Sequence, residues 1–349
     1  MKKLQINLII LTIIFGLSGF CPAGDNQFPS EEQINRANET LRQSLIKSEI
    51  PIKEIASNLM YQKYEELEKI YEEIFYQYRA DVTYEARLWW AYDIFNPKSG
   101  LPIGELNRWV ETTGSYIAYT ARGFYYTNLA YAVRGQEYVA NTPAEHLDEM
   151  HQYLAKAIPD LKKAIELNPK NMPAYAAMIQ AAMSEPSVDA EKYLETALKN
   201  DERSYYVRSQ YMLKLQPRWG GSYEAMEQFG DETAAKADLN PRFWTFKGAV
   251  AADKASLAYD EGDMKTAAKF YNYAMKFGER VQWLQYRAAC YYKSGQLEEA
   301  HRDFVRMLYY DGENELAKEW SQYLSAKIAF DKMQTAGNDR EEVSQESGR

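Results

Sequence analysis

The clearest hydrophobic pattern in the chain is a series of small and large apolar residues that occurs twice near the C-terminus, thirty-three residues apart. The first copy comprises Ala251, Ala255, Ala258, Gly262, Met264, Ala267, Tyr271 and Ala274, and the second comprises Leu284, Ala288, Tyr291, Gly295, Leu297, Ala300, Phe304 and Met307. The spacing of three and four residues predicts two amphipathic helices per copy, with the glycine ending the first helix. A period of this length is typical of stacked helix pairs.

Similar patterns extend this array towards the N-terminus. Residues 157–169 match a second helix with its closing proline, and residues 175–197 match a further pair. Residues 203–241 match another pair, with Ser222 as the expected N-cap of its second helix. We therefore expect five helix pairs over about 143–311, followed by a capping helix that ends near 332. Each pair would bury its apolar face against the next pair.

The N-terminal region, 24–142, also has helical periodicity, with apolar residues three and four positions apart over 59–75. A second helix over 85–95 is stopped by the turn signal at 96–100, and a helix pair follows at about 103–136. No alternating run rich in Val or Ile follows residue 23. The prediction is an all-α fold, a right-handed α-solenoid, with a disordered tail at 333–349 that carries only two larger aliphatic side chains.

The first residues have the order of a secretory signal peptide. Lys2 and Lys3 precede an apolar run at 8–17, and small residues follow up to Ala23. The run is too short for a permanent membrane span, so we expect cleavage after residue 23 and an exported chain, periplasmic or secreted, without an integral membrane segment. Lipid attachment at Cys21 is the less favoured alternative, because Phe20 stands where lipoprotein signals have a small residue.

Composition and charge narrow the function classes. The chain has 349 residues, 46% of them hydrophobic, which is enough for a substantial core. With 50 acidic against 41 basic residues the net charge is -9, which disfavours nucleic acid and anionic lipid as partners. We find no nucleophile motif or phosphate-binding loop, and His146 and His151 are spaced wrongly for a helical zinc site. No catalytic residue, metal or cofactor is predicted.

The segment 217–222 is the candidate binding site, and it comprises Pro217, Arg218, Trp219, Gly220, Gly221 and Ser222. Arg218 and the amides of the two glycines can hold an anion ahead of a helix N-terminus, and Trp219 can stack on a sugar or a peptide group. The favoured interpretation is structural: the indole fills a gap between helix pairs, Arg218 pairs with a carboxylate of a neighbouring helix, and the glycines form the turn. In that case Trp219→Ala would cost about 3–5 kcal/mol.

The two C-terminal copies resemble the tetratricopeptide repeat. Further segments resemble an uncharacterised bacterial family that places such helices on either side of an Arg-Trp-Gly-Gly-Ser loop. The resemblance covers about 60–320, and its carriers include Trp109-Val110, Ser115-Tyr116, Ala121-Arg122-Gly123, Arg134-Gly135 and the 217–222 loop. It implies the helical-repeat fold and no activity.

These observations favour an exported scaffold that binds a protein, a peptide or a glycan through the concave surface of the solenoid. Some of the 29 tyrosines would then line a groove, although aromatic residues in such repeats also pack between helices. The alternative is a cell-envelope enzyme acting on glycan or peptide, with a pocket near Arg218 and Ser222. Such an enzyme requires one deep pocket with convergent polar groups.

Overall fold

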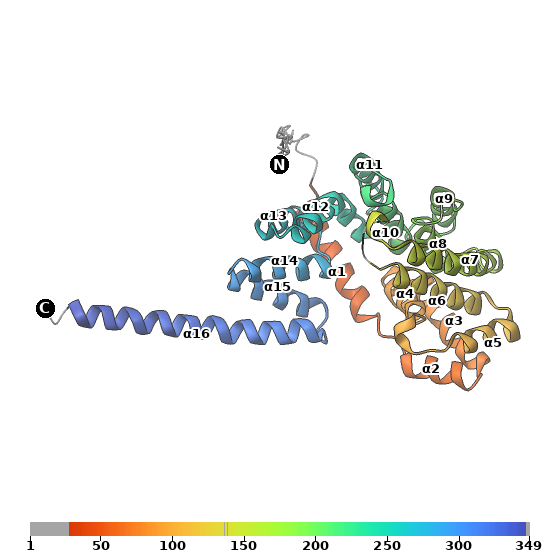
Figure 1. The fold of residues 1–349 in the computed structure, drawn as a ribbon, viewed down its shortest axis with the longest axis horizontal. Coiled ribbons are helices and arrows are strands. Elements are labelled where there is room, and N and C mark those ends of the chain that lie inside the picture. The colour runs from red at the N-terminus through yellow and green to blue at the C-terminus, as the bar shows by residue number, and fades with distance from the viewer. Residues whose placement is uncertain (1–27, 136, 138, 347–349) are drawn as a thin grey trace, which may run out of the picture.

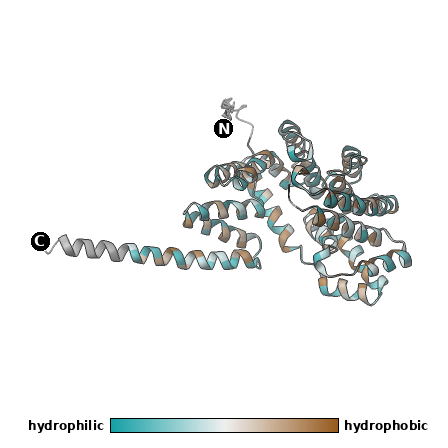
Figure 2. Ribbon diagram, in the orientation of Figure 1, coloured by the Kyte–Doolittle hydropathy of each residue, from teal (hydrophilic) through white to brown (hydrophobic). Residues whose placement is uncertain are grey.

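The computed structural model describes residues 28–135, 137 and 139–346, and every regular element in this part of the chain is helical (Figure 1). The predicted all-α solenoid is confirmed. The predicted signal peptide at 1–23, with Cys21, lies outside the described residues. Figure 2 shows hydrophilic and hydrophobic residues interspersed along the helices, as expected for elements with one buried face. None of the described helices is both long and apolar enough to cross a bilayer.

The N-terminal half contains six α-helices: α1 (Glu31–Ile46), α2 (Ile52–Met60), α3 (Tyr64–Ala80), α4 (Glu85–Asp93), α5 (Ile103–Thr113) and α6 (Tyr116–Arg134). The short 3-10 helices η1 (Val82–Tyr84) and η2 (Pro97–Ser99) flank α4. The turn predicted after α4 is confirmed, because the Asn96 side chain accepts the N–H of Lys98 and Gly100 has a φ of 74°.

The repeats that follow comprise α7 (Ala144–Leu167), α8 (Met172–Ala181), α9 (Ala190–Asn200), α10 (Tyr205–Lys214), α11 (Tyr223–Ala234), α12 (Ala249–Asp260), α13 (Met264–Ala274), α14 (Val281–Lys293) and α15 (Leu297–Tyr310). The 3-10 helices η3 (Val139–Asn141), η4 (Pro217–Trp219), η5 (Pro241–Gly248) and η6 (Met275–Phe277) lie between them. The two predicted C-terminal copies are the pairs α12–α13 and α14–α15. The small residues Ala267 and Ala300, which allow the two helices of each pair to approach closely, are fully buried. The glycines that end the first helices, Gly262 and Gly295, have left-handed φ angles of 84° and 75°.

The first pair differs from the prediction, because α7 is one uninterrupted helix that packs on α6. A Cβ atom on Gly123 of α6 would lie 2.6 Å from Leu161 of α7, so only glycine permits this approach. Arg122 and Asp160 add two hydrogen bonds of 2.7 Å between the helices. The predicted boundary at 142 lies between these two helices. Pro159 lies inside α7 without ending it.

The last helix, α16 (Glu315–Glu346), caps the array and then projects from the body (Figure 1). Its first half packs on α15, where the Trp320 ring stacks on Phe304 with centroids 5.6 Å apart. Further along, Phe330 and Met333 are 57% and 69% exposed. The helix continues to Glu346, within the segment for which the sequence predicts disorder. This segment contains no proline and extends an element that is already helical.

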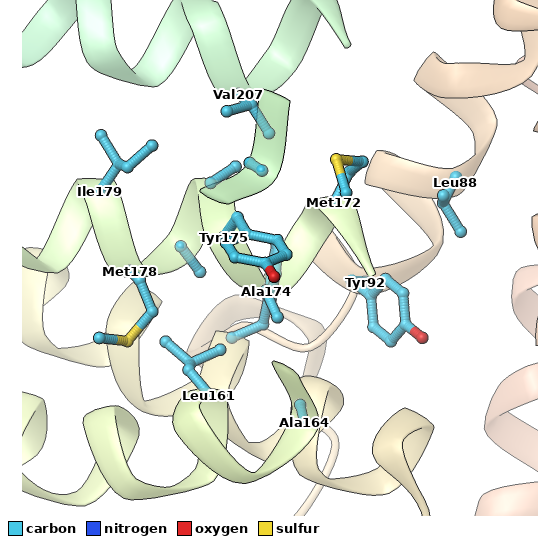
Figure 3. Close-up of a cluster of buried hydrophobic side chains, with 14 of the residues drawn as sticks. Leu88, Tyr92, Leu161, Ala164, Met172, Ala174, Tyr175, Met178, Ile179 and Val207 are labelled. Atoms are coloured by element: carbon cyan, nitrogen blue, oxygen red, sulfur yellow. The ribbon is translucent and has the colours of Figure 1, made fainter. Parts of the chain in front are cut away.

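At the centre of the core lies α8, which is buried at every position except Gln180. Figure 3 shows Tyr175 of this helix among side chains from neighbouring elements, including Leu161 of α7 and Tyr92 of α4. The same α4 also contacts α10. The Trp89 ring of α4 stacks on Tyr206 of α10 at 5.2 Å. The N-terminal helix α4 thus packs on two helices of the repeat array.

A second long-range arrangement involves α1, which lies between the C-terminal repeats and the N-terminal helices (Figure 1). On one side, the Asn38 side chain accepts the Glu279 N–H at 2.8 Å, and Leu41 is buried among residues of the C-terminal core. At the far end of the helix, the Lys47 ammonium donates to Asp81 beside α4 at 2.8 Å. The helix α1 thus ties the two ends of the solenoid together.

Candidate functional site

The 217–222 loop, which connects α10 to α11, has a tightly determined backbone. Gly220 has a φ of 83°, where a side chain would be strained. A Cβ atom on Gly221 would lie 2.1 Å from the carbonyl oxygen of Leu215. The Lys214 ammonium donates to the carbonyl oxygen of Trp219 at 2.8 Å and holds the loop from the preceding helix. Both glycines are therefore required by the shape of the turn.

The amide groups of this loop are used within it. The N–H groups of Trp219, Gly220 and Gly221 donate to loop carbonyls at 2.9, 3.0 and 3.2 Å. Ser222 is the N-cap of α11, as predicted, and its hydroxyl accepts the N–H of Ala225 at 3.2 Å. The geometry therefore disfavours the interpretation in which the glycine amides hold an anion.

Trp219 is half-buried against the end of α6. Its ring meets that of Tyr131 edge to face, at a centroid distance of 6.3 Å, and the guanidinium carbon of Arg134 lies 4.9 Å from the indole centroid. Arg134 is itself buried and donates to the carbonyl of Gly135. The indole thus fills part of a gap between helices, as the structural interpretation predicts, and leaves its remaining surface exposed.

Arg218 is exposed and lies near Asp253 of α12. Burial raises the pKa of the Asp253 carboxyl group, while a hydrogen bond from Tyr223 and the charge of Arg218 partly oppose that increase. The ammonium of Lys254 lies 4.8 Å from the centroid of the Tyr223 ring. The charge of Arg218 thus acts on a carboxylate of α12. We call Arg218, Trp219, Tyr223, Asp253 and Lys254 the loop surface.

Among the clefts of the described residues, two open ones lie away from this loop. One, of about 490 Å³, lies between the start of α15 and α16 and is lined by residues that include Leu297 and Lys332. The other, of about 360 Å³, lies where α1 ends beside α4 and is lined by residues that include Lys47 and Arg87. Neither cleft includes a residue of the 217–222 loop. The enzyme alternative, which requires a pocket there, gains no support from them.

The other residues singled out for chemistry are isolated. Within the described ranges, no three His, Cys, Asp or Glu side chains gather as a metal site would require. The nearest carboxylate oxygen to His151 is that of Glu185, 3.7 Å from the ring nitrogen. Cys290 is fully buried in α14, and burial raises the pKa of its thiol to about 11. This burial agrees with a core role for the cysteine.

Sequence reasoning missed a buried polar cluster around Glu85, at the start of α4. The carboxylate accepts the Ser204 hydroxyl at 2.5 Å and the Tyr205 N–H at 2.8 Å, so it caps the N-terminus of α10 from another helix. Burial raises the pKa of this carboxyl group to about 7, although these hydrogen bonds oppose the increase. No local motif signals the cluster, because its members come from distant parts of the chain.

No protein-family model matches this chain, and no curated protein matches its sequence. Among solved structures, a tetratricopeptide repeat protein from Parabacteroides merdae is similar at 14% identity and a TM-score of 0.35, over 81% of this chain and 99% of that one. Human IFIT1, in a dimer with m7Gppp-AAAA, is similar at 14% identity and a TM-score of 0.31, over 86% of this chain and 70% of its own. The resemblance to an uncharacterised bacterial family stays a prediction.

Proposed function

We propose that this chain is an exported helical-repeat scaffold that binds a protein or peptide partner, with a glycan as the alternative ligand. The observation that carries the proposal is the loop surface. Arg218 and part of the Trp219 ring are exposed on a loop whose amides are already hydrogen-bonded internally. Aromatic and arginine side chains on such a rigid support are typical of protein interfaces.

The loop surface is a better candidate than the concave surface. Helix α8 is buried at every position except Gln180 and also contacts α4, so it offers a partner little accessible area. The loop instead lies outside this contact, and it is held from both sides by Lys214 and by the end of α6. A preformed surface loses little conformational entropy on binding. Its neighbourhood also presents both charge signs, through Arg218 and Asp253, which suits a peptide better than a nucleic acid.

Export is a separate part of the proposal, and it is supported by the apolar run at 8–17 behind Lys2 and Lys3. The test is the N-terminal sequence of the protein recovered from the cell envelope or the medium. A chain beginning at residue 24 is the expected result. A chain that retains residues 1–23 would contradict signal cleavage, and a lipid-modified Cys21 would support the lipoprotein alternative.

The binding proposal is tested by capture with residues 24–349 from envelope extract. Arg218→Glu changes the charge of the loop surface without removing the half-buried indole. Arg302→Glu is the matched control, because the Arg302 side chain is 72% exposed on α15, away from the loop. Both variants are first compared with the wild type by circular dichroism and thermal unfolding.

The expected result is a defined protein whose recovery falls at least about tenfold with Arg218→Glu and stays unchanged with Arg302→Glu. Purified cell-wall glycan is assayed beside the extract, so that retention of the glycan alone would identify the alternative ligand. Equal recovery with both variants would show that the loop surface is not the binding site. Turnover of the glycan or a peptide by the wild type would favour the enzyme alternative instead.

A further inference from the structure

A second site emerges from the packing of η5 against α10 and α14. Tyr205 of α10 lies at its centre. The guanidinium carbon of Arg242, in η5, is 3.7 Å from the centroid of the Tyr205 ring, and that of Arg280, the N-cap of α14, is 5.3 Å from the same centroid. Two arginines from different elements therefore share one aromatic ring.

These arginines lack the carboxylate partners that others in the chain have. Arg242 is only 9% exposed, yet its guanidinium makes no ion pair or hydrogen bond with any residue that the structure describes. Arg280 donates through Nε and Nη2 to the hydroxyl of Thr245, at 3.3 and 3.1 Å, and has no ion pair within the same residues. By contrast, Arg287 of α14 makes two hydrogen bonds to Asp303.

The local charge is unbalanced as a result. Burial lowers the pKa of Arg280, and the neighbouring charge of Arg242 lowers it further, while Tyr205 opposes both effects. The carboxylate that interacts with Arg242 is that of Glu85, but it is already held by Ser204 and by backbone amides. Arg280 has no ion pair with a carboxylate of the described residues, so burial costs it hydration that no counter-charge replaces.

We propose that Arg242 and Arg280 form a binding site for a tetrahedral oxyanion of the phosphate or sulfate class. A guanidinium group donates two parallel hydrogen bonds to such an anion, and two guanidinium groups would neutralise its charge. Stacking fixes the direction of both groups: Arg280 also lies 4.7 Å from the centroid of the Trp283 ring. Arg280 is the less buried residue of the pair.

The position of the site gives the anion a structural consequence. Gly278, two residues before Arg280, lies between Thr245 of η5 and Ala37 of α1. Binding at the arginine pair would therefore stabilise the region where α1 contacts the C-terminal repeats. Anything that binds the folded state alone raises its stability in proportion to the logarithm of its concentration.

The experiment is a titration of residues 24–349 with inorganic phosphate, followed by isothermal titration calorimetry and by thermal unfolding, with chloride added to keep the ionic strength constant. Arg280→Gln removes one guanidinium at a partly exposed position, where the fold is expected to tolerate the change. Arg280→Lys keeps the charge and removes the paired donors. Arg302→Gln is the control, since it deletes the same charge from an exposed position on α15.

We expect saturable binding by the wild type and the Arg302→Gln variant, with a dissociation constant at least about tenfold higher for Arg280→Gln and an intermediate value for Arg280→Lys. Phosphate and sulfate also stabilise proteins without binding, so a thermal shift of equal size in wild type and Arg280→Gln would overturn the proposal. Absence of saturable heat in the wild type would overturn it as well.

Phenyl phosphate separates two sources of the anion. Binding of inorganic phosphate with exclusion of phenyl phosphate would support a site for a free anion. Binding of both would support a site that also accepts a phosphate group carried by a larger ligand. These results are independent of the proposed function, because Arg218→Glu at the loop surface is expected to leave the phosphate titration unchanged.

Discussion

Glu85→Gln tests the buried contact by which α4 holds the N-terminus of α10. Glu85 is 3% exposed, and its carboxylate accepts hydrogen bonds from the Ser204 hydroxyl and from the N–H groups of Tyr205 and Tyr206. The charge of Arg242 also favours the ionised form. Glutamine has nearly the same shape as the carboxyl group but does not titrate, so the substitution removes the proton equilibrium and largely preserves the packing.

The expected pH dependence follows from the pKa of Glu85, which burial raises from 4.5 to about 7. The folded state then binds the proton more tightly than the unfolded state. The resulting stabilisation is fully present below 4.5 and is lost as the pH rises through 7. Between about pH 5 and pH 8 this single group should lower the free energy of unfolding by about 2–3 kcal/mol.

The measurement is urea unfolding followed by circular dichroism at several pH values across this range, for the wild type and for two variants. Between pH 5 and pH 8, the free energy of unfolding of the wild type should fall by about 2–3 kcal/mol more than that of Glu85→Gln. Glu73→Gln is the control, because Glu73 lies on the exposed face of α3 and should keep the wild-type slope. If Glu85→Gln and the wild type show the same slope, the raised pKa and the buried-contact argument are wrong.

Three further substitutions test particular contacts by the same urea unfolding. Trp219→Ala should lower the free energy of unfolding by about 1–3 kcal/mol, because it removes one edge-to-face contact and one cation–π contact. This is less than the loss expected for a fully buried tryptophan. A negligible change would contradict the packing role. Gly221→Ala should cost about 3 kcal/mol, since its Cβ atom would meet the backbone of Leu215 at 2.1 Å, and a neutral result would exclude that geometry. Leu41→Ala should cost about 2–4 kcal/mol if α1 is an integral part of the fold, with the partly exposed Leu257→Ala as control.

The helix pairs could be predicted from the sequence because the signals that define them are local. Gly262 and Gly295 end helices through their own backbone conformation, and the small residues that follow fix how closely two neighbouring helices approach. Ser222 was identified as an N-cap for the same reason: its hydroxyl bonds an amide three residues away. Such information lies within one period of the repeat.

The positions of α1 and α4 could not be predicted in this way. Asn38 contacts Glu279, and Glu85 contacts Ser204, through hydrogen bonds that join residues far apart in the sequence. Neither pair forms a motif. The sequence neighbours of an asparagine or glutamate do not show whether it is buried, because its partner comes from a distant part of the chain. The eight-residue η5 was missed for a similar reason. Its residues Phe243 and Phe246 are buried against other parts of the chain, and this packing stabilises it.

The same distinction explains why the loop could be found from the sequence while two interpretations of its chemistry stayed open. The residue types of the 217–222 loop indicated both an anion site and a packing role, since glycine amides serve either purpose. The choice between them depends on the carbonyl groups that the folded loop presents to its own amides, and those hydrogen bonds leave no donor at Gly220 or Gly221 for a ligand. Arg242 of η5 and Arg280 near the start of α14 are the opposite case. They were singled out because neither makes an ion pair with a described residue, and no local motif indicates this. Anion binding in this chain is thus expected where guanidinium groups are buried without carboxylates, and not where the sequence has the more familiar motif.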